Sequence, residues 1–168
     1  YKSMNPMGRV PTFIHDGFRL TESMAIIQYI DDTFSGLQII PTDPKQKARA
    51  IQMAEIINAG IQPLQNLGAA AELGKRFGAD KAAKEDWMKF WIAKGLTALE
   101  AEAKATAGPY LVGDNVSVAD LFLVPQAYNA RRFGIDMNDF PKLAETEANC
   151  MKLKAFDLAQ PSKQPDAE

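Results

Sequence analysis

Cysteine and histidine are almost absent from the sequence, and each scarcity excludes a kind of site. The 168 residues include one cysteine, Cys150, and one histidine, His15. A single cysteine can form neither an intrachain disulfide nor a thiolate zinc site, and a single histidine cannot supply two imidazoles to a metal. His15 is the only candidate for histidine-based catalysis, but its place in an expected hairpin turn predicts an exposed, non-catalytic side chain. Cys150 is expected to be a small buried apolar residue.

The chain also lacks an excess of one charge and a long apolar run. Nineteen basic residues face 21 acidic ones, for a formal net charge of −2. This balance provides no basic surface for nucleic acid or for an anionic membrane. No apolar run approaches the roughly 18 residues that a membrane span requires. We therefore expect a reduced, cytoplasmic protein without nucleic-acid or membrane partners and without a bound metal.

The first part of the chain has the pattern of a small hairpin and a helix. Residues 10–21 contain two short strand-like runs separated by an Asp-Gly turn signal. Helical spacing of apolar residues follows over Ser23–Thr33. We assign residues 1–36 to this unit. Glycine and two prolines interrupt the pattern afterwards, which predicts a linker over residues 37–44.

The rest of the chain, residues 45–168, is predicted to be an all-helical domain because no strand-like alternation occurs in it. Pro63 should kink or restart the second helix, and Gly74 should stop it. Ser117 and Asp120 have the spacing of a capping box at the start of an apolar helix. The predicted helices cover 45–60, 61–73, 80 to about Thr106, 117 onward, and 139 to about Phe156.

Two residue pairs in the first unit form the strongest candidate site. Pro11 opens a strand, which leaves the backbone of Val10 free to pair with an extended peptide. Ser23 lies at a helix N-terminus, which favours a carboxylate, and Glu22 beside it can attract an ammonium group. These features suit a short peptide with an amino acid head group. Alternatively, Pro11 only opens an edge strand and Ser23 only caps a helix.

The motifs resemble a known family. Residues 5–13 (NPMGRVPTF) and 21–30 (TESMAIIQYI) are similar to the second half of the thioredoxin-like domain of glutathione transferases. Residues 117–120 (SVAD) resemble the capping box of their helical domain. The run 60–67 (GIQPLQNL), with 110–114 (YLVGD), 123–126 (LVPQ) and 129–133 (NARRF), resembles the zeta class, the family of maleylacetoacetate isomerases. The implied fold is a two-domain α+β glutathione transferase fold: a partial thioredoxin-like domain, with a β-hairpin and a helix, followed by an all-α domain.

The resemblance implies a reaction and a cofactor. The reaction is the cis–trans isomerisation of maleylacetoacetate to fumarylacetoacetate, in phenylalanine and tyrosine breakdown, with glutathione as a returned cofactor. Thiolate addition turns the conjugated double bond into a single bond that can rotate, and elimination restores the alkene in its trans form. Glutathione transfer or dehalogenation of small α-halo acids can accompany this activity in the class.

The resemblance also assigns roles to individual residues of the first unit. It implies that Val10 pairs with the cysteinyl backbone of glutathione and that Pro11 is a cis-proline. Glu22 and Ser23 hold the γ-glutamyl head group. Other zeta proteins often have glutamine at the position of Glu22, and a carboxylate there still suits the ammonium group.

Three further assignments fall in the helical domain. Gln62 and Asn66 match residues near the pocket for glutathione and substrate. Arg132 matches an arginine that anchors a carboxylate of the dicarboxylate substrate, and its neighbour Arg131 is the less favoured candidate. On the residues alone, Arg132 could equally be a surface arginine in a salt bridge.

No serine of this chain matches the thiol-activating serine of the family. The family's motif lies on the first strand–helix turn, so we expect it in a strand–helix–strand segment upstream of Tyr1. Two other interpretations remain open, namely a zeta-like detoxifying transferase or dehalogenase and an inactive binding or scaffold protein on the same fold. The family resemblance also implies a homodimer.

Overall fold

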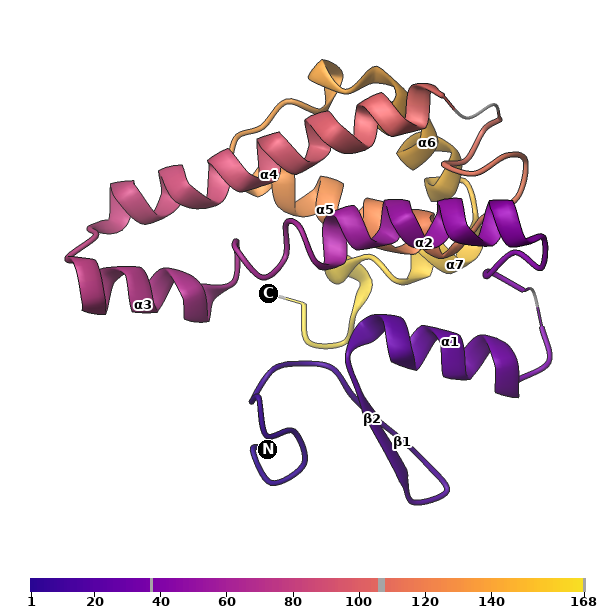
Figure 1. Cartoon of the computed structure of the whole chain (residues 1–168), viewed down its shortest axis with the longest axis horizontal. Helices are drawn as coiled ribbons and strands as arrows, with labels where there is room; N and C mark the ends of the chain where they lie inside the picture. Colours follow the sequence, from indigo (N-terminus) through magenta and orange to yellow (C-terminus); the bar gives the residue numbers. More distant parts are fainter. Residues whose placement is uncertain (37, 106–107, 168) are drawn as a thin grey trace. The chain divides into compact units, whose positions relative to one another are not determined.

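The structure, a computed structural model, describes residues 1–36, 38–105 and 108–167. It divides into two compact units, Tyr1–Ile40 and Pro41–Glu168 (Figure 1). The expected linker start at residue 37 and the expected helix end near Thr106 lie outside the described residues.

The first unit is the predicted hairpin followed by the predicted helix. Strands β1 (Thr12–His15) and β2 (Phe18–Thr21) are antiparallel, with Thr12 opposite Thr21 and His15 opposite Phe18. The Asp-Gly turn joins them with positive φ angles of 49° at Asp16 and 78° at Gly17, the conformation that a two-residue hairpin loop requires. Helix α1 (Ser23–Thr33) buries Ile26. The sequence pattern of this unit is confirmed.

Within its described residues, the second unit contains helices and turns and no strand. Helices α2 and α5 pack against each other, as do α4 and α6 (Figure 1). Fully buried side chains of these helices and their connections form the core, including Met53, Ile57, Ile92, Leu96, Leu99, Leu123 and Leu143. The helices are α2 (Pro44–Asn58), α3 (Leu67–Phe77), α4 (Lys81–Lys104), α5 (Val118–Arg132), α6 (Pro141–Met151) and α7 (Lys154–Leu158), with 3-10 turns η1 (Met137–Asp139) and η2 (Pro161–Lys163).

The helix predicted over 61–73 is wrong in both of its bounds. Residues 59–65 form turns, and α3 begins only at Leu67, after Asn66. Pro63 cannot donate a backbone hydrogen bond to the preceding turn, so the helix does not continue through it. The predicted stop at Gly74 lies inside α3, and the helix ends four residues later at Gly78, whose φ of 70° makes a left-handed C-cap.

The helix predicted over 139–156 is also wrong in extent. It is divided into α6 and α7 at Lys152 and Leu153, and Pro141 takes the first helical position of α6. A proline suits that position because the first N–H of a helix has no acceptor within it.

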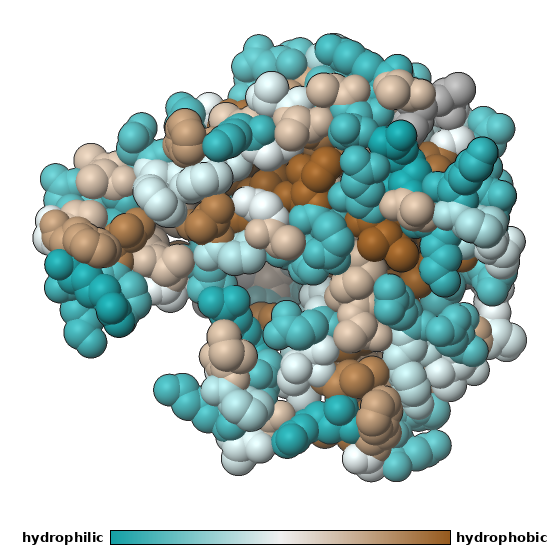
Figure 2. Space-filling model, in the orientation of Figure 1, coloured by the Kyte–Doolittle hydropathy of each residue, from teal (hydrophilic) through white to brown (hydrophobic). Residues whose placement is uncertain are grey.

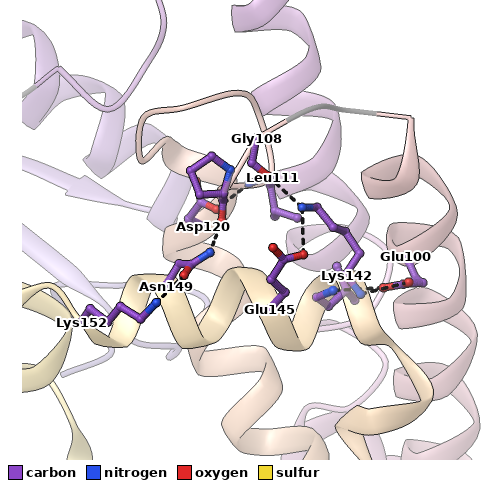
Figure 3. Close-up of polar contacts among 10 residues, drawn as sticks. Glu100, Gly108, Leu111, Asp120, Lys142, Glu145, Asn149 and Lys152 are labelled. Carbon is purple, nitrogen blue, oxygen red and sulfur yellow. Dashed lines mark hydrogen bonds and ion pairs between the residues drawn. The ribbon is translucent and has the colours of Figure 1, made fainter.

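Side chains of α5 and α6 fix the connection between α4 and α5 (Figure 3). Asp120 accepts hydrogen bonds from the Ser117 N–H at 2.8 Å, the Ser117 hydroxyl at 3.0 Å and the Leu111 N–H at 3.0 Å. From α6, Lys142 Nζ donates to the Gly108 carbonyl at 2.8 Å and Asn149 donates to the carbonyl of residue 109 at 3.0 Å. The loop is thereby tied to α5 on one side and to α6 on the other. The Ser117–Asp120 motif acts as a helix start, as predicted.

Candidate functional site

The Val10–Pro11 peptide bond lies just before the hairpin, and the backbone of Val10 is available to a ligand. The bond is cis, as the resemblance implies, and Val10 is 85% exposed. The strand ladder begins at Thr12, so Val10 lies just outside it. The preceding carbonyl, of Arg9, accepts from the Tyr1 hydroxyl at 2.6 Å and from Asn5 Nδ2 at 2.5 Å. These contacts hold the strand entrance in place, while the edge of Val10 stays open to a peptide ligand.

Glu22 and Ser23 form the beginning of α1. Glu22 is the residue at the N-cap position, with φ 70° and ψ 117° and an exposed side chain. A non-glycine residue at positive φ carries about 1–3 kcal/mol of strain and is common at ligand sites. The Glu22 side chain makes no cap, and Ser23 is the first helical residue, one position beyond the N-cap. The alternative that Ser23 only caps the helix is therefore wrong, and the first-turn N–H groups remain available to an anion.

His15 is placed differently from its prediction. It is the last residue of β1 instead of a turn residue, and its side chain is half-buried. Its Nδ1 lies 2.8 Å from the Tyr29 hydroxyl, and its ring centroid lies 4.9 Å from that of Phe34. The alternation of the strand turns the imidazole toward the aromatic side chains of the unit. His15 therefore has a packing role.

Gln62 and Asn66 lie in the turn segment that joins α2 to α3. Gln62 is half-buried; its backbone N–H donates to the Ile57 carbonyl at 2.9 Å, whereas its side-chain amide has no hydrogen-bond partner among the described residues. Asn66 Oδ1 accepts from the Gly68 N–H at 2.8 Å, which makes Asn66 the N-cap of α3. Trp87 of α4 donates from Nε1 to the Leu64 carbonyl at 2.9 Å, between these two residues. These contacts anchor the segment, and the side-chain amide of Gln62 stays free to bind a ligand.

The two arginines at the end of α5 have different surroundings. Arg131 donates from both terminal nitrogens to Glu147, at 2.7 and 2.5 Å, and these hydrogen bonds to the Glu147 carboxylate raise the pKa of Arg131. Arg132 is exposed and has no ion pair within the described part of the chain. It lines an open cavity of about 400 Å³ with Lys89, Phe133 and two acidic residues of α4, Glu85 and Asp86. Of the two, Arg132 is the guanidinium available to a carboxylate.

Cys150 is fully buried, as predicted. Burial, with a smaller contribution from the Asp120 and Glu147 carboxylates, raises the pKa of its thiol to about 12. A thiol that stays protonated at neutral pH is a poor nucleophile.

The candidate residues fall into two groups, each within one unit. Val10, Pro11, Glu22 and Ser23 belong to the first unit, and Gln62, Asn66 and Arg132 belong to the second. Sequence reasoning missed the contacts that hold the second group, such as that of Trp87, because residues far apart in the sequence make them.

Comparisons with known proteins agree on one family. The model of the glutathione S-transferase N-terminal domain matches residues 1–32, and that of the C-terminal domain matches residues 78–153. The probable maleylacetoacetate isomerase 2 of Drosophila melanogaster is 39% identical over 166 residues, which are 99% of this chain and 70% of that protein.

Two solved structures extend this similarity. A bacterial zeta-class maleylpyruvate isomerase has a TM-score of 0.94 and 35% identity over 99% of this chain and 80% of its own. The maleylacetoacetate isomerase of Methylobacterium extorquens AM1, solved with malonate and glutathione bound, has a TM-score of 0.95 and 30% identity over 99% and 79%. Within the described ranges, no helix is both long and apolar enough to span a bilayer.

Proposed function

The chain belongs to the zeta class of glutathione transferases, the family of the maleylacetoacetate isomerases, and we propose that it isomerises maleylacetoacetate to fumarylacetoacetate with glutathione as cofactor. This step belongs to phenylalanine and tyrosine breakdown. The scaffold alternative is not favoured, because the relatives are named as enzymes.

The residues of the first unit fit glutathione in three respects. The exposed backbone of Val10 can pair with the cysteinyl residue, as one strand pairs with another. The uncapped first turn at Ser23 can donate to the γ-glutamyl carboxylate. Glu22 can accept from the ammonium group of the same head group. When bound, glutathione supplies a thiolate that adds reversibly to the double bond of the substrate.

The observation that carries the proposal for the substrate is the contrast between Arg131 and Arg132. Glu147 occupies both terminal nitrogens of Arg131, whereas Arg132 faces an open cavity without an ion pair in the described residues. A planar guanidinium can hold a carboxylate through two parallel hydrogen bonds. Arg132 would fix one end of the dicarboxylate, and the free amide of Gln62 can donate to it or to glutathione. Asn66 keeps its Nδ2 for the same purpose while its oxygen caps α3.

We also propose that the protein is a homodimer in the cytoplasm. A reducing compartment keeps glutathione in its thiol form, which the reaction requires. Large apolar side chains are exposed on α3 and α4, with Phe77 at 78% and Phe90 at 54%. Figure 2 shows hydrophobic residues at the surface of the molecule. Exposed aromatic residues of this kind are enriched at interfaces. Light scattering at several concentrations would report a mass of two chains if this is correct.

Calorimetric titration with glutathione tests the cofactor site directly. We expect saturable binding by the parent protein and binding about tenfold weaker for Ser23→Ala or Glu22→Ala, since each removes one contact to the head group. Glu72→Ala, which removes an exposed carboxylate that pairs with Arg76 on the same helix, is the matched control and should bind as the parent does. Equal affinity for all four proteins would refute the head-group assignment. Relative turnover of maleylacetone, maleylpyruvate and chloroacetate then identifies the substrate class.

A further inference from the structure

We propose that Gln65 and Gln126 are positioning residues, which fix the segment that carries Gln62 and Asn66 against the helix that carries Arg132. The inference rests on the proposed function, because it concerns the placement of the residues assigned there to glutathione and substrate. No motif of the sequence indicates this role, since the two glutamines lie 61 residues apart.

The two side chains form a reciprocal pair of hydrogen bonds. Gln65 Nε2 donates to Gln126 Oε1 at 2.9 Å, and Gln126 Nε2 donates to Gln65 Oε1 at 3.0 Å. Gln126 is 1% exposed, in the middle of the apolar helix α5, and Gln65 is half-buried. Each amide therefore satisfies the other where little water is available to replace it. Two opposed hydrogen bonds fix both the distance and the orientation of the joined segments, whereas an apolar contact would allow sliding.

The position of the pair couples the candidate residues of the helical unit. Gln65 directly precedes Asn66 and follows Gln62 by three residues. Gln126 belongs to α5, which ends at Arg132. A displacement of Gln65 from Gln126 would thus move both amides relative to the arginine.

A short stretch of α4, residues 86–89, contacts both the segment at Leu64 and the cavity of Arg132. Trp87 holds the carbonyl of Leu64, next to Gln65, at 2.9 Å. Its neighbours Asp86 and Lys89 line the cavity of Arg132. With the segment held at Leu64 by α4 and at Gln65 by α5, the side-chain amide of Gln62 remains without an internal partner in the described residues. A buried amide pair costs more desolvation than two leucines would, so the choice of glutamine indicates a need for defined orientation.

Four proteins test the proposal: the parent, Gln65→Leu, Gln126→Leu and the double variant. Each single variant leaves one amide unpaired, so we expect a Tm lower by about 5 °C. The double variant has no unpaired amide, and its Tm should return to within about 2 °C of the parent. If the pair positions the site, the KM for maleylacetone stays roughly tenfold above that of the parent even in the double variant, because orientation is lost while stability is restored.

Asn149→Leu is the control for a purely structural bond, since it removes a comparable hydrogen bond to the loop at residue 109. It should lower the Tm without changing the KM. Recovery of both Tm and KM in the double variant would overturn the proposal, as would single variants with the KM of the parent. Absence of glutathione-dependent turnover in the parent would instead refute the proposed function, and with it the basis of this inference.

Discussion

The packing of the segment at residues 60–66 against α4 predicts that Gly95→Ala destabilises the protein when Ile61 is present and stabilises it when Ile61 is removed. A Cβ added at Gly95 of α4 would lie 2.2 Å from Ile61 Cγ1 and 2.5 Å from its Cδ1. Ordinary contact is 3.4–4 Å, and Ile61 is fully buried. Gly95→Ala must therefore displace Ile61, and with it the segment that holds Gln62 and Asn66.

The expected magnitude follows from two opposing effects. Alanine is favoured over glycine in a helix by about 1 kcal/mol. Overpacking a filled core costs about 1–3 kcal/mol, and the short distances place this site at the upper end of that range. Gly95→Ala should thus lower the free energy of unfolding by about 2 kcal/mol.

The effect should reverse when the clashing atoms are removed. Ile61→Ala alone should cost about 2–5 kcal/mol through lost burial and the cavity it leaves. In that background Gly95→Ala meets no Cγ1 or Cδ1, and it should stabilise the protein by about 1 kcal/mol. The coupling between the two changes is then about 3 kcal/mol. Urea unfolding of the four proteins, followed by tryptophan fluorescence, measures it. Additive effects, or a stabilising Gly95→Ala in the parent, would refute the packing described here.

Three further predictions concern single side chains of the helical unit. Arg132→Ala should raise the KM for maleylacetone roughly 10–100-fold with little change in Tm. Arg131→Ala should instead lower the free energy of unfolding by about 2 kcal/mol, because Glu147 loses its partner. The opposite pattern would show that Arg131 binds the substrate and that Arg132 is structural. Burial raises the pKa of Asp120, so this carboxyl holds its proton more tightly in the folded protein than in the unfolded chain. The folded protein therefore loses stability as pH rises through the folded pKa of Asp120. As pH rises above about 4, the unfolded pKa of an aspartate, the free energy of unfolding of the parent should therefore fall relative to that of Asp120→Asn in urea titrations, and a relative rise would contradict this. Cys150, with its pKa of about 12, should not react with Ellman's reagent at pH 8 until the protein unfolds.

Secondary structure could be predicted from the sequence where neighbouring residues determine it. The hairpin over 12–21 and the helix at 23–33 follow from an Asp-Gly turn and from apolar spacing, and both are present. The helix predicted over 61–73 failed because apolar periodicity continues through a segment that Pro63 prevents from being helical. Its backbone groups are instead held by tertiary contacts, such as that between Leu64 and Trp87.

The candidate site likewise could be predicted where its residues are close in sequence, and not where distant residues meet. Val10, Pro11, Glu22 and Ser23 lie within 14 residues of one another, and their motif could be recognised directly. The family resemblance already favoured Arg132 over Arg131, but the pairing of Arg131 with Glu147 on another helix is a contact that no local pattern specifies. The pairing of Gln65 with Gln126 was likewise hidden, because a buried glutamine among apolar residues has no signature in sequence.

The central claim, that glutathione acts here as a returned cofactor in isomerisation, is tested most directly by following maleylacetone turnover and total thiol together. Glutathione is varied while the absorbance of the cis and trans forms is recorded, and the thiol content is titrated before and after many turnovers. We predict a rate that saturates with glutathione, quantitative formation of the trans product and an unchanged thiol content. Turnover without glutathione, or loss of one thiol for each substrate consumed, would contradict the account.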